Sequence, residues 1–237
     1  MPPGNPAHVF GATAGRAATA DIDANLLRIE DEYRVHEYAQ RSANPDEILI
    51  AQPTRTARIT VLAQHAINHF DAYGREKLAD RGTGALVELV APRADILGII
   101  STGRLRGPEH QRQRHSAMVA RAIADGRPSI DLHGMSCDGV SAVDIGTGRE
   151  PSAASRLIAD AAIECGDRLG LPVTRNRRFG ARGPERLTNV LLDHGVPAIQ
   201  AELCSCLRQP HSGPAETALV VAWFDSLTST ISRALAG

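Results

Sequence analysis

The segment QHAINHF carries two histidines at a spacing that suits one metal ion. His65 and His69 are four residues apart, so in a helical turn both imidazoles would face the same side. Neutral imidazole is a strong zinc ligand, and HExxH helices use this spacing, although no glutamate lies between these two histidines. Asn68 would also neighbour His65 on such a turn. The segment alone indicates either a metal site or a surface or capping pair of histidines.

A third histidine, His133, comes at the end of the strand-like segment SIDLHGM. Gly134 follows it, and a glycine there would let the backbone leave the strand sharply. Asp131 is two residues earlier, so its side chain would point to the same face as His133. A carboxylate beside a ligand imidazole fixes its tautomer and raises its basicity, which predicts a supporting role for Asp131. The alternative is a buried strand histidine hydrogen-bonded to an aspartate.

The late segment PAIQAEL is apolar except for Gln200 and Glu202, which would share one face of a strand. A carboxylate in an apolar strand is costly unless it is paired or has a chemical task. Near a metal and its water, Glu202 could serve as a general base. The alternative is a structural ion pair with one of the many arginines.

These side chains must be positioned by an alternation of strands and helices. Strands are predicted at 48–52, 58–63, 96–101, 129–133, 172–175 and 197–203. Helices are predicted at 21–41, 83–91, 111–125, 152–169, 184–194 and 214–236. Such an alternation predicts an α/β fold with a mainly parallel or mixed central sheet and helices on both faces. The carboxyl ends of parallel strands meet at one edge, which would bring His65, His133 and Glu202 together.

The composition fits one globular domain. The chain has 237 residues, 43% of them hydrophobic, and we assign 21–237 to a single α/β domain behind a flexible N-terminal tail, 1–20. A net charge of -1 gives no strong field for nucleic acid or an anionic membrane, so neither is an expected partner. No apolar run approaches the ~20 residues of a membrane helix, and no secretory signal is recognisable, so we expect a cytoplasmic protein. The oligomeric state is not indicated.

The four cysteines do not match a paired CxxC zinc site. In a reducing compartment we expect all of them to be free thiols. Cys204 and Cys206 would share one face of a strand, where we interpret them as small buried hydrophobic residues.

Arginine supplies nearly all of the positive charge, since Lys77 is the only lysine. A guanidinium binds a carboxylate through two directional hydrogen bonds. Five arginines lie at or just after the ends of predicted strands and are candidates for binding a substrate carboxylate: Arg104, Arg106, Arg175, Arg177 and Arg178. The alternative is a set of solvated basic loops.

Seven segments, in order from about residue 61 to 208, resemble the N-formylglutamate amidohydrolase family, a relative of the zinc carboxypeptidase fold. They are AQHAINHF, KLADRGTGALVEL, ISTGRLRGPEH, SIDLHGMS, VDIGTG, RNRRFGARGPERLT and VPAIQAELC. The DRGTGAL segment and the spacing from DLHG to the late strand with Glu202 are the most specific.

The resemblance implies a zinc-dependent amidohydrolase that cleaves the amide bond of a small N-acyl amino acid or peptide-like substrate bearing a carboxylate. His65 and His133 would bind zinc (or another divalent metal), and Glu202 would carry protons. The usual third ligand, a glutamate soon after the first histidine, is missing, so we expect His69 to replace it, with Asn68 or water as alternatives.

A second departure concerns the substrate. The family commonly has an aspartate-asparagine-arginine stretch after the third strand, and 107–110 reads Gly-Pro-Glu-His instead. Recognition of a glutamate-type substrate therefore does not carry over. Two alternatives stay open: a fold relative that binds a ligand or partner without hydrolysis, and a metallopeptidase acting on poly-glutamate or cell-wall peptide.

Overall fold

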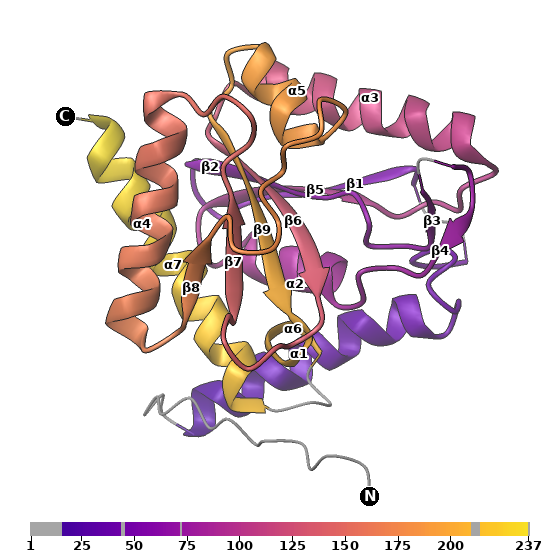
Figure 1. Cartoon of the computed structure of the whole chain (residues 1–237). Coiled ribbons are helices and arrows are strands. Elements are labelled where there is room, and N and C mark those ends of the chain that lie inside the picture. Colours follow the sequence, from indigo (N-terminus) through magenta and orange to yellow (C-terminus); the bar gives the residue numbers. More distant parts are fainter. Residues whose placement is uncertain (1–15, 44–45, 72, 210–213, 237) are drawn as a thin grey trace, which may run out of the picture.

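Seven strands form a mixed central sheet in the computed structural model, which describes residues 16–43, 46–71, 73–209 and 214–236 (Figure 1). The strands are β1 (Ile48–Ala51), β2 (Ile59–Ala63), β5 (Ile96–Ser101), β6 (Ser129–Met135), β7 (Val143–Gly146), β8 (Val173–Arg175) and β9 (Ala198–Cys204). Their spatial order is β1-β5-β2-β6-β9-β7-β8. The four central strands, β5, β2, β6 and β9, are parallel to one another. At one edge of the sheet, β1 is antiparallel to β5. At the other edge, β7 is antiparallel to β9 and parallel to β8. β3 (His69–Phe70) and β4 (Glu76–Lys77) form a separate two-stranded sheet.

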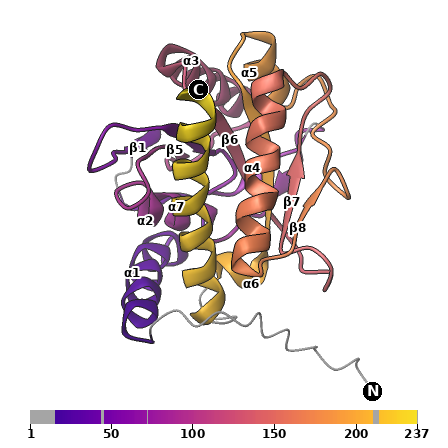
Figure 2. The same cartoon turned by 90° about the vertical axis from the view of Figure 1, so that its left-hand side faces the viewer.

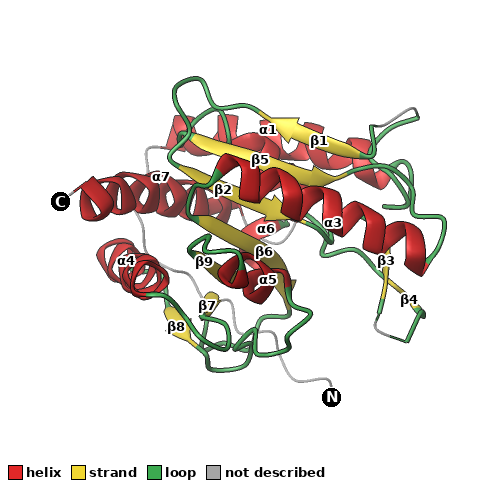
Figure 3. Cartoon of the chain, turned by 90° about the horizontal axis from the view of Figure 1, so that it is seen from above, coloured by secondary structure: helices red, strands yellow, loops and turns green. Residues whose placement is uncertain are grey.

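Helices cover both faces of the sheet (Figures 2 and 3). They are α1 (Arg16–Arg34), α2 (Thr83–Val90), α3 (Pro108–Asp125), α4 (Ala153–Leu169), α5 (Leu187–Asp193), α6 (Ser205–Arg208) and α7 (Pro214–Ala236). α2, α4 and α7 pack on one face, with α1 against α2 and α7, and α3 and α5 pack on the other. Within the residues that the structure describes, no helix combines the length and apolar character that crossing a membrane requires.

Two apolar cores explain this layering. Val61 and Ile130 point into the core shared with α2, α4 and α7, whereas Leu62 and Ile99 point into the core shared with α3 and α5. β5 is buried along its whole length. Near-continuous apolar runs of this kind are typical of parallel strands that are covered on both faces.

The predicted α/β fold with a mixed sheet and helices on both faces is confirmed, and each predicted strand and helix is present with small shifts at its ends. α1 differs most. It begins at Arg16, so residues 16–20 of the predicted tail are helical, while residues 1–15 lie outside the described part of the chain. It ends at Arg34 instead of 41, because the chain turns through Glu37 and Tyr38, whose φ angles are 53° and 58°.

The prediction that all four cysteines are free thiols is wrong. Cys137 and Cys204 are joined by a disulfide, with their Cα atoms 4.8 Å apart, whereas Cys165 and Cys206 are free. Cys206 lies in α6 and not on a strand with Cys204. No local sequence pattern indicates this pairing, because its partners are 67 residues apart and become neighbours only where β6 and β9 end.

Glu30 of α1 is a buried acid whose protonation should control stability. It accepts a hydrogen bond from the Tyr38 hydroxyl, and burial raises its pKa to about 7. A folded-state pKa above the unfolded value means that this contribution to stability is complete below the unfolded pKa and is lost as the pH rises through about 7.

Replacing Glu30 with glutamine should therefore stabilise the protein at alkaline pH. Glutamine keeps an acceptor for Tyr38 but carries no charge. The difference in unfolding free energy between variant and wild type should move by about 3 kcal/mol in favour of the variant from pH 4 to pH 8. Denaturant unfolding at both pH values measures it, with the exposed Glu37→Gln as control. A difference that does not change with pH would show that Glu30 is ionised in the folded protein.

Candidate metal centre

His133 and Glu202 lie side by side at the carboxyl end of the sheet. They are register partners in the adjacent parallel strands β6 and β9, with Asp131 and Gln200 as the pair two residues earlier. All four side chains are buried. Their strand neighbours, such as Ile130, face the core under α2, α4 and α7, so these polar side chains point to the opposite face, beneath α3 and α5.

His65, Asp80 and His133 bring potential ligand atoms together at this edge. Asp80 Oδ2 is 3.5 Å from His65 Nδ1 and 3.4 Å from His133 Nδ1. One ligand atom from each of the three residues lies within 4.8 Å of the other two. His65 and His133 were predicted to meet at this edge, whereas Asp80 was not among the predicted site residues.

Asp80 is held in place by the loop that closes after β2. Its backbone N–H donates to the His65 carbonyl at 2.8 Å. Asn68 Oδ1 accepts from the Ala79 N–H at 3.0 Å, and its amide nitrogen donates to the Glu37 carbonyl at 3.0 Å. The side chain of Asn68 is thus engaged with the backbone, where it fixes the segment that carries Asp80.

Arg208 ties this segment to the strand ends. Its guanidinium donates to the carbonyls of Leu203 and Met135, at 3.2 and 3.3 Å, and to the carbonyl of Arg81. Gly134 explains why the guanidinium fits, since a Cβ there would lie 2.4 Å from Arg208 Cζ. The predicted sharp exit at Gly134 is wrong, because β6 continues through it to Met135.

The charges at this edge are strongly coupled. Burial opposes ionisation of Asp80, but hydrogen bonds from His133 and His65 outweigh it and hold the Asp80 pKa well below its ordinary range. Burial also opposes a charge on His133, yet the neighbouring Asp131 raises the pKa of His133 well above its usual value. Asp131 Oδ2 is 3.1 Å from His133 Nε2, so the imidazole lies between two carboxylates, with Asp80 at Nδ1 and Asp131 at Nε2.

Two further histidines surround His65. The rings of His65 and His69 stack with centroids 3.9 Å apart, although His69 lies in β3 and not in the predicted helical turn. His115 of α3 has its ring centroid 6.1 Å from that of His65. Burial and the nearby His65 lower the pKa of His69 to about 3 and that of His115 to about 4, which keeps both imidazoles neutral. His69 Nδ1 is buried without a hydrogen-bond partner among the described residues.

Glu202 has the environment of a proton carrier. Burial raises its pKa to about 7, against the opposing influence of His133. Gln200 Nε2 donates to Glu202 Oε1 at 2.7 Å, which orients the carboxyl group. A carboxyl group with a pKa near 7 can both accept and return a proton at neutral pH.

A cavity of about 790 Å³ opens beside the histidines. Gln64, His65, His69 and His115 form part of its wall, together with residues of α3, of the β3–β4 hairpin and of the start of α5. Asp80, His133 and Glu202 are not among the lining residues. Its cationic lining residues are Arg75, Lys77, Arg112 and Arg186.

None of the arginines predicted from the sequence lines this cavity, whether Arg104, Arg106, Arg175, Arg177 or Arg178. Arg177 forms an ion pair with Asp138, Arg178 lies 3.5 Å from the same carboxylate, and Arg175 pairs with Asp160. Arg104 and Arg106 are exposed.

The loop after β8 explains why Arg186 reaches the cavity instead. Asp144 of β7 is fully buried and accepts hydrogen bonds from the backbone N–H groups of Arg177, Arg178 and Phe179, at 3.1, 2.7 and 3.0 Å. These bonds fix the start of the loop, and Asn189 fixes its later part through the carbonyls of residues 181 and 183.

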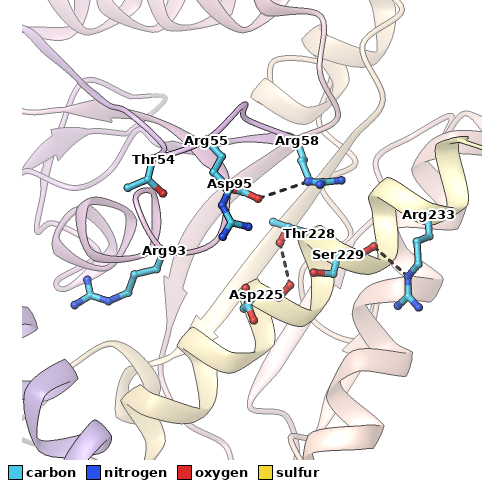
Figure 4. Close-up of a pocket in the computed structure, with 9 residues that line it drawn as sticks. All are labelled: Thr54, Arg55, Arg58, Arg93, Asp95, Asp225, Thr228, Ser229 and Arg233. Atoms are coloured by element: carbon cyan, nitrogen blue, oxygen red, sulfur yellow. Dashed lines mark hydrogen bonds and ion pairs between the residues drawn. The ribbon is translucent and has the colours of Figure 1, made fainter.

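A second cavity of about 470 Å³, whose lining residues are drawn in Figure 4, lies at the opposite end of the sheet. Arg58 directly precedes β2 and Asp95 directly precedes β5, so this cavity is at the amino ends of those strands. Arg55, Arg93 and Arg233 complete its basic lining, and it contains no histidine or cysteine. It therefore does not belong to the candidate metal centre.

The potential ligands His65, Asp80 and His133 are of the kinds that bind zinc. Two imidazole nitrogens and one carboxylate oxygen are ordinary zinc ligands, and three protein ligands leave a position open for chemistry. The stacked His69, whose Nδ1 has no partner among the described residues, is a third nitrogen donor close by.

The central, mostly parallel sheet with helices on both faces is shared with several solved structures. N-formylglutamate amidohydrolase from Ralstonia eutropha superposes with a TM-score of 0.58 and 13% identity, over 79% of this chain and 99% of that one. A gene product from Agrobacterium tumefaciens gives 0.54 and 14%, over 81% and 97% of the two chains. A bacteriophage poly-γ-glutamate hydrolase reaches a TM-score of only 0.49, at 12% identity over 80% and 89%.

At these identities the likeness concerns the fold alone, and it confirms the fold that the sequence resemblance implied. No protein-family model matches the sequence, and no curated protein matches it.

Proposed function

We propose that this protein is a zinc-dependent amidohydrolase that cleaves the amide bond of a small substrate bearing a carboxylate. One observation carries the proposal: three metal-ligand donors converge within 4.8 Å at the carboxyl edge of the sheet, beside a buried glutamate with a pKa of about 7. The relationship in fold to an N-formylglutamate amidohydrolase supports the same reaction class. The cytoplasmic location stays a prediction.

His65, Asp80 and His133 would hold the metal. The sequence assigned the third position to His69 or Asn68, but Asp80 faces both of the other ligands, and Asn68 is engaged with the backbone. His69 would pack against His65 and restrict its ring. Asp131 would accept a hydrogen bond from His133 Nε2, which directs Nδ1 of that ring toward Asp80. A bound divalent metal would supply Lewis-acid polarisation of the amide carbonyl.

Glu202 would move the proton. Its carboxylate would accept a proton from the attacking water and later deliver it to the leaving amine nitrogen. The hydrogen bond from Gln200 leaves Oε2 of Glu202 free for this task. Exclusion of solvent from the buried strand end keeps the pKa of Glu202 close to neutral, where both halves of the transfer are fast.

We assign the substrate carboxylate to Arg186. It lines the cavity, and its charge lies close enough to Glu202 to lower the pKa of that group against the larger effect of burial. Its nearest acid is the exposed Glu185, with Nε 3.7 Å from Oε1, so the guanidinium is not engaged in a tight pair. Arg177 and Arg178, the earlier candidates, are held by Asp138.

Replacing Arg186 with lysine should raise KM by about 10- to 100-fold with a smaller change in kcat, because lysine cannot reproduce two directional hydrogen bonds to a carboxylate. Steady-state kinetics of the variant measure this. Arg177→Lys is the matched control and should leave KM unchanged. If Arg177→Lys raised KM and Arg186→Lys did not, the substrate carboxylate would be bound by the loop arginines that were predicted from the sequence.

A panel of N-acyl amino acids and short peptides, assayed for amine release with added zinc, tests the function directly. Hydrolysis that depends on both the metal and a substrate carboxylate is expected. Tight binding of panel members without any turnover would instead support the non-hydrolytic alternative.

A further inference from the structure

Three of the four cysteines gather where β6 and β9 end. Cys137 follows β6 and is exposed, Cys204 is the buried last residue of β9, and Cys206 is half-buried in α6. Their sulfur atoms all lie within 4.8 Å of one another. No residue of this thiol cluster takes part in the proposed hydrolysis.

The third thiol touches the disulfide. Cys206 Sγ lies 3.4 Å from Cys204 Sγ, which is one of the two sulfurs bonded in the Cys137–Cys204 disulfide. Exchange begins with attack of a thiolate on one disulfide sulfur, so a free thiol already in contact with that sulfur needs only a small movement. The fourth cysteine, Cys165, is buried in α4 against Thr230 and cannot serve in this role.

The Cys137 sulfur is well placed to be the leaving group of this exchange. Cys137 Sγ accepts from the backbone N–H of Cys206 at 3.5 Å and lies 3.3 Å from the Ser205 hydroxyl. Both groups can donate to a thiolate as it forms, and the exposure of Cys137 gives solutes access to it. Burial raises the pKa of the Cys206 thiol, which keeps most of it protonated at neutral pH and lets the Cys137–Cys204 bond persist.

We propose that Cys137, Cys204 and Cys206 form a thiol–disulfide exchange site that reacts with low-molecular-weight disulfides of the glutathione type. The Cys206 thiolate attacks Cys204 Sγ, the Cys204–Cys206 bond forms, and the Cys137–Cys204 bond breaks with its electron pair going to Cys137 as a thiolate. The Cys137 thiolate then attacks a low-molecular-weight disulfide, forms a mixed disulfide and releases one thiol. The first step consumes no external oxidant, and the second uses the named disulfide.

The exchange would alter a segment beside the candidate metal centre. The Cys137–Cys204 bond links residue 137, just past β6, to the end of β9. The same loop pairs Asp138 with Arg177 and offers the Ser136 carbonyl to Arg178 at 3.3 Å. Release of Cys137 would therefore loosen the contact between this loop and the arginine loop after β8.

Mass-spectrometric mapping of the disulfides in the full-length protein tests the proposal. The oxidised protein is treated with reduced and oxidised glutathione, and its thiols are blocked with N-ethylmaleimide at timed intervals. The wild type should show a Cys204–Cys206 disulfide together with glutathione on Cys137. Cys206→Ser should lack the first species and lose its Cys137–Cys204 bond at least about tenfold more slowly, because the adjacent nucleophile is gone. The control Cys165→Ser should behave as wild type.

Three results would overturn the proposal. The first is the absence of any disulfide within the thiol cluster after oxidation by glutathione disulfide. The second is reduction of Cys206→Ser at the wild-type rate. The third is a bound metal ion that is lost when any one of the three cysteines becomes serine and is retained in His65→Ala, which would make the cluster a thiolate metal site. None of these outcomes depends on amide hydrolysis, so the two proposals fail independently.

Discussion

Replacing Glu202 with glutamine should lower kcat by about 10²- to 10⁴-fold while the protein keeps its metal, because general acid–base transfer contributes about that much to rate. Glutamine has nearly the same shape and can still accept the hydrogen bond from Gln200, so the strand end should not rearrange. It cannot take a proton from water. KM should change little, since the lost interaction is made in the transition state.

The measurement is steady-state kinetics of the variant beside its metal content. Glu164→Gln, an exposed glutamate on α4, is the control for the same chemical change and should leave kcat unchanged. Full activity of the Glu202 variant would show that this carboxyl group is structural and that the proton carrier lies elsewhere.

Removing a proposed ligand should have the second large effect, on metal affinity. Asp80→Ala and His133→Ala should each weaken zinc binding by more than the roughly 10- to 100-fold that loss of a supporting residue costs. His69→Ala should fall within that smaller range, because His69 stacks on His65 while Asp80 faces both histidine ligands. Competition with a chelator of known affinity measures all three constants.

The zinc affinities of these alanine variants also show whether Asp80 or His69 is the third ligand. Circular dichroism shows whether each variant is folded, which separates loss of a ligand from loss of structure. If His69→Ala loses zinc and Asp80→Ala keeps it, the assignment made from the sequence is right and the one made from the loop geometry is wrong.

Sequence patterns predicted the fold well because most of its strands are short apolar runs that alternate with helices. The run ILGIIS predicted β5 with the ends that the structure has, Ile96 and Ser101. β7 was missed, since VDIG is only four residues long and its strand pairing depends on β9, more than fifty residues later. The VDIGTG segment was part of the resemblance, but only the structure explains Asp144, which anchors the arginine loop.

The candidate site residues that lie at strand ends could be predicted from the sequence, whereas those that lie in loops could not. His133 and Glu202 were expected to meet because parallel strands bring their carboxyl ends together, and they are register partners. Asp80 lies in the quoted KLADRGTGALVEL segment. Its approach to His65 depends on hydrogen bonds that the Ala79 and Asp80 N–H groups donate to the Asn68 side chain and the His65 carbonyl, and no local pattern encodes these bonds. Arg186, which we propose for the substrate carboxylate, was not predicted from the sequence, because its position beside the cavity follows from the anchoring of the loop before α5.

The central claim, a metal centre at the carboxyl edge of the sheet, is tested most directly by counting metal ions. Protein saturated with zinc and freed of excess by gel filtration is analysed by inductively coupled plasma mass spectrometry, alongside the His65→Ala/His133→Ala double variant. Cys137→Ser serves as the control for zinc held by thiols. We expect one zinc ion per chain in the wild type and in the cysteine variant, and none in the double variant. A wild-type protein that retains no metal, or a double variant that retains as much as wild type, would contradict the account.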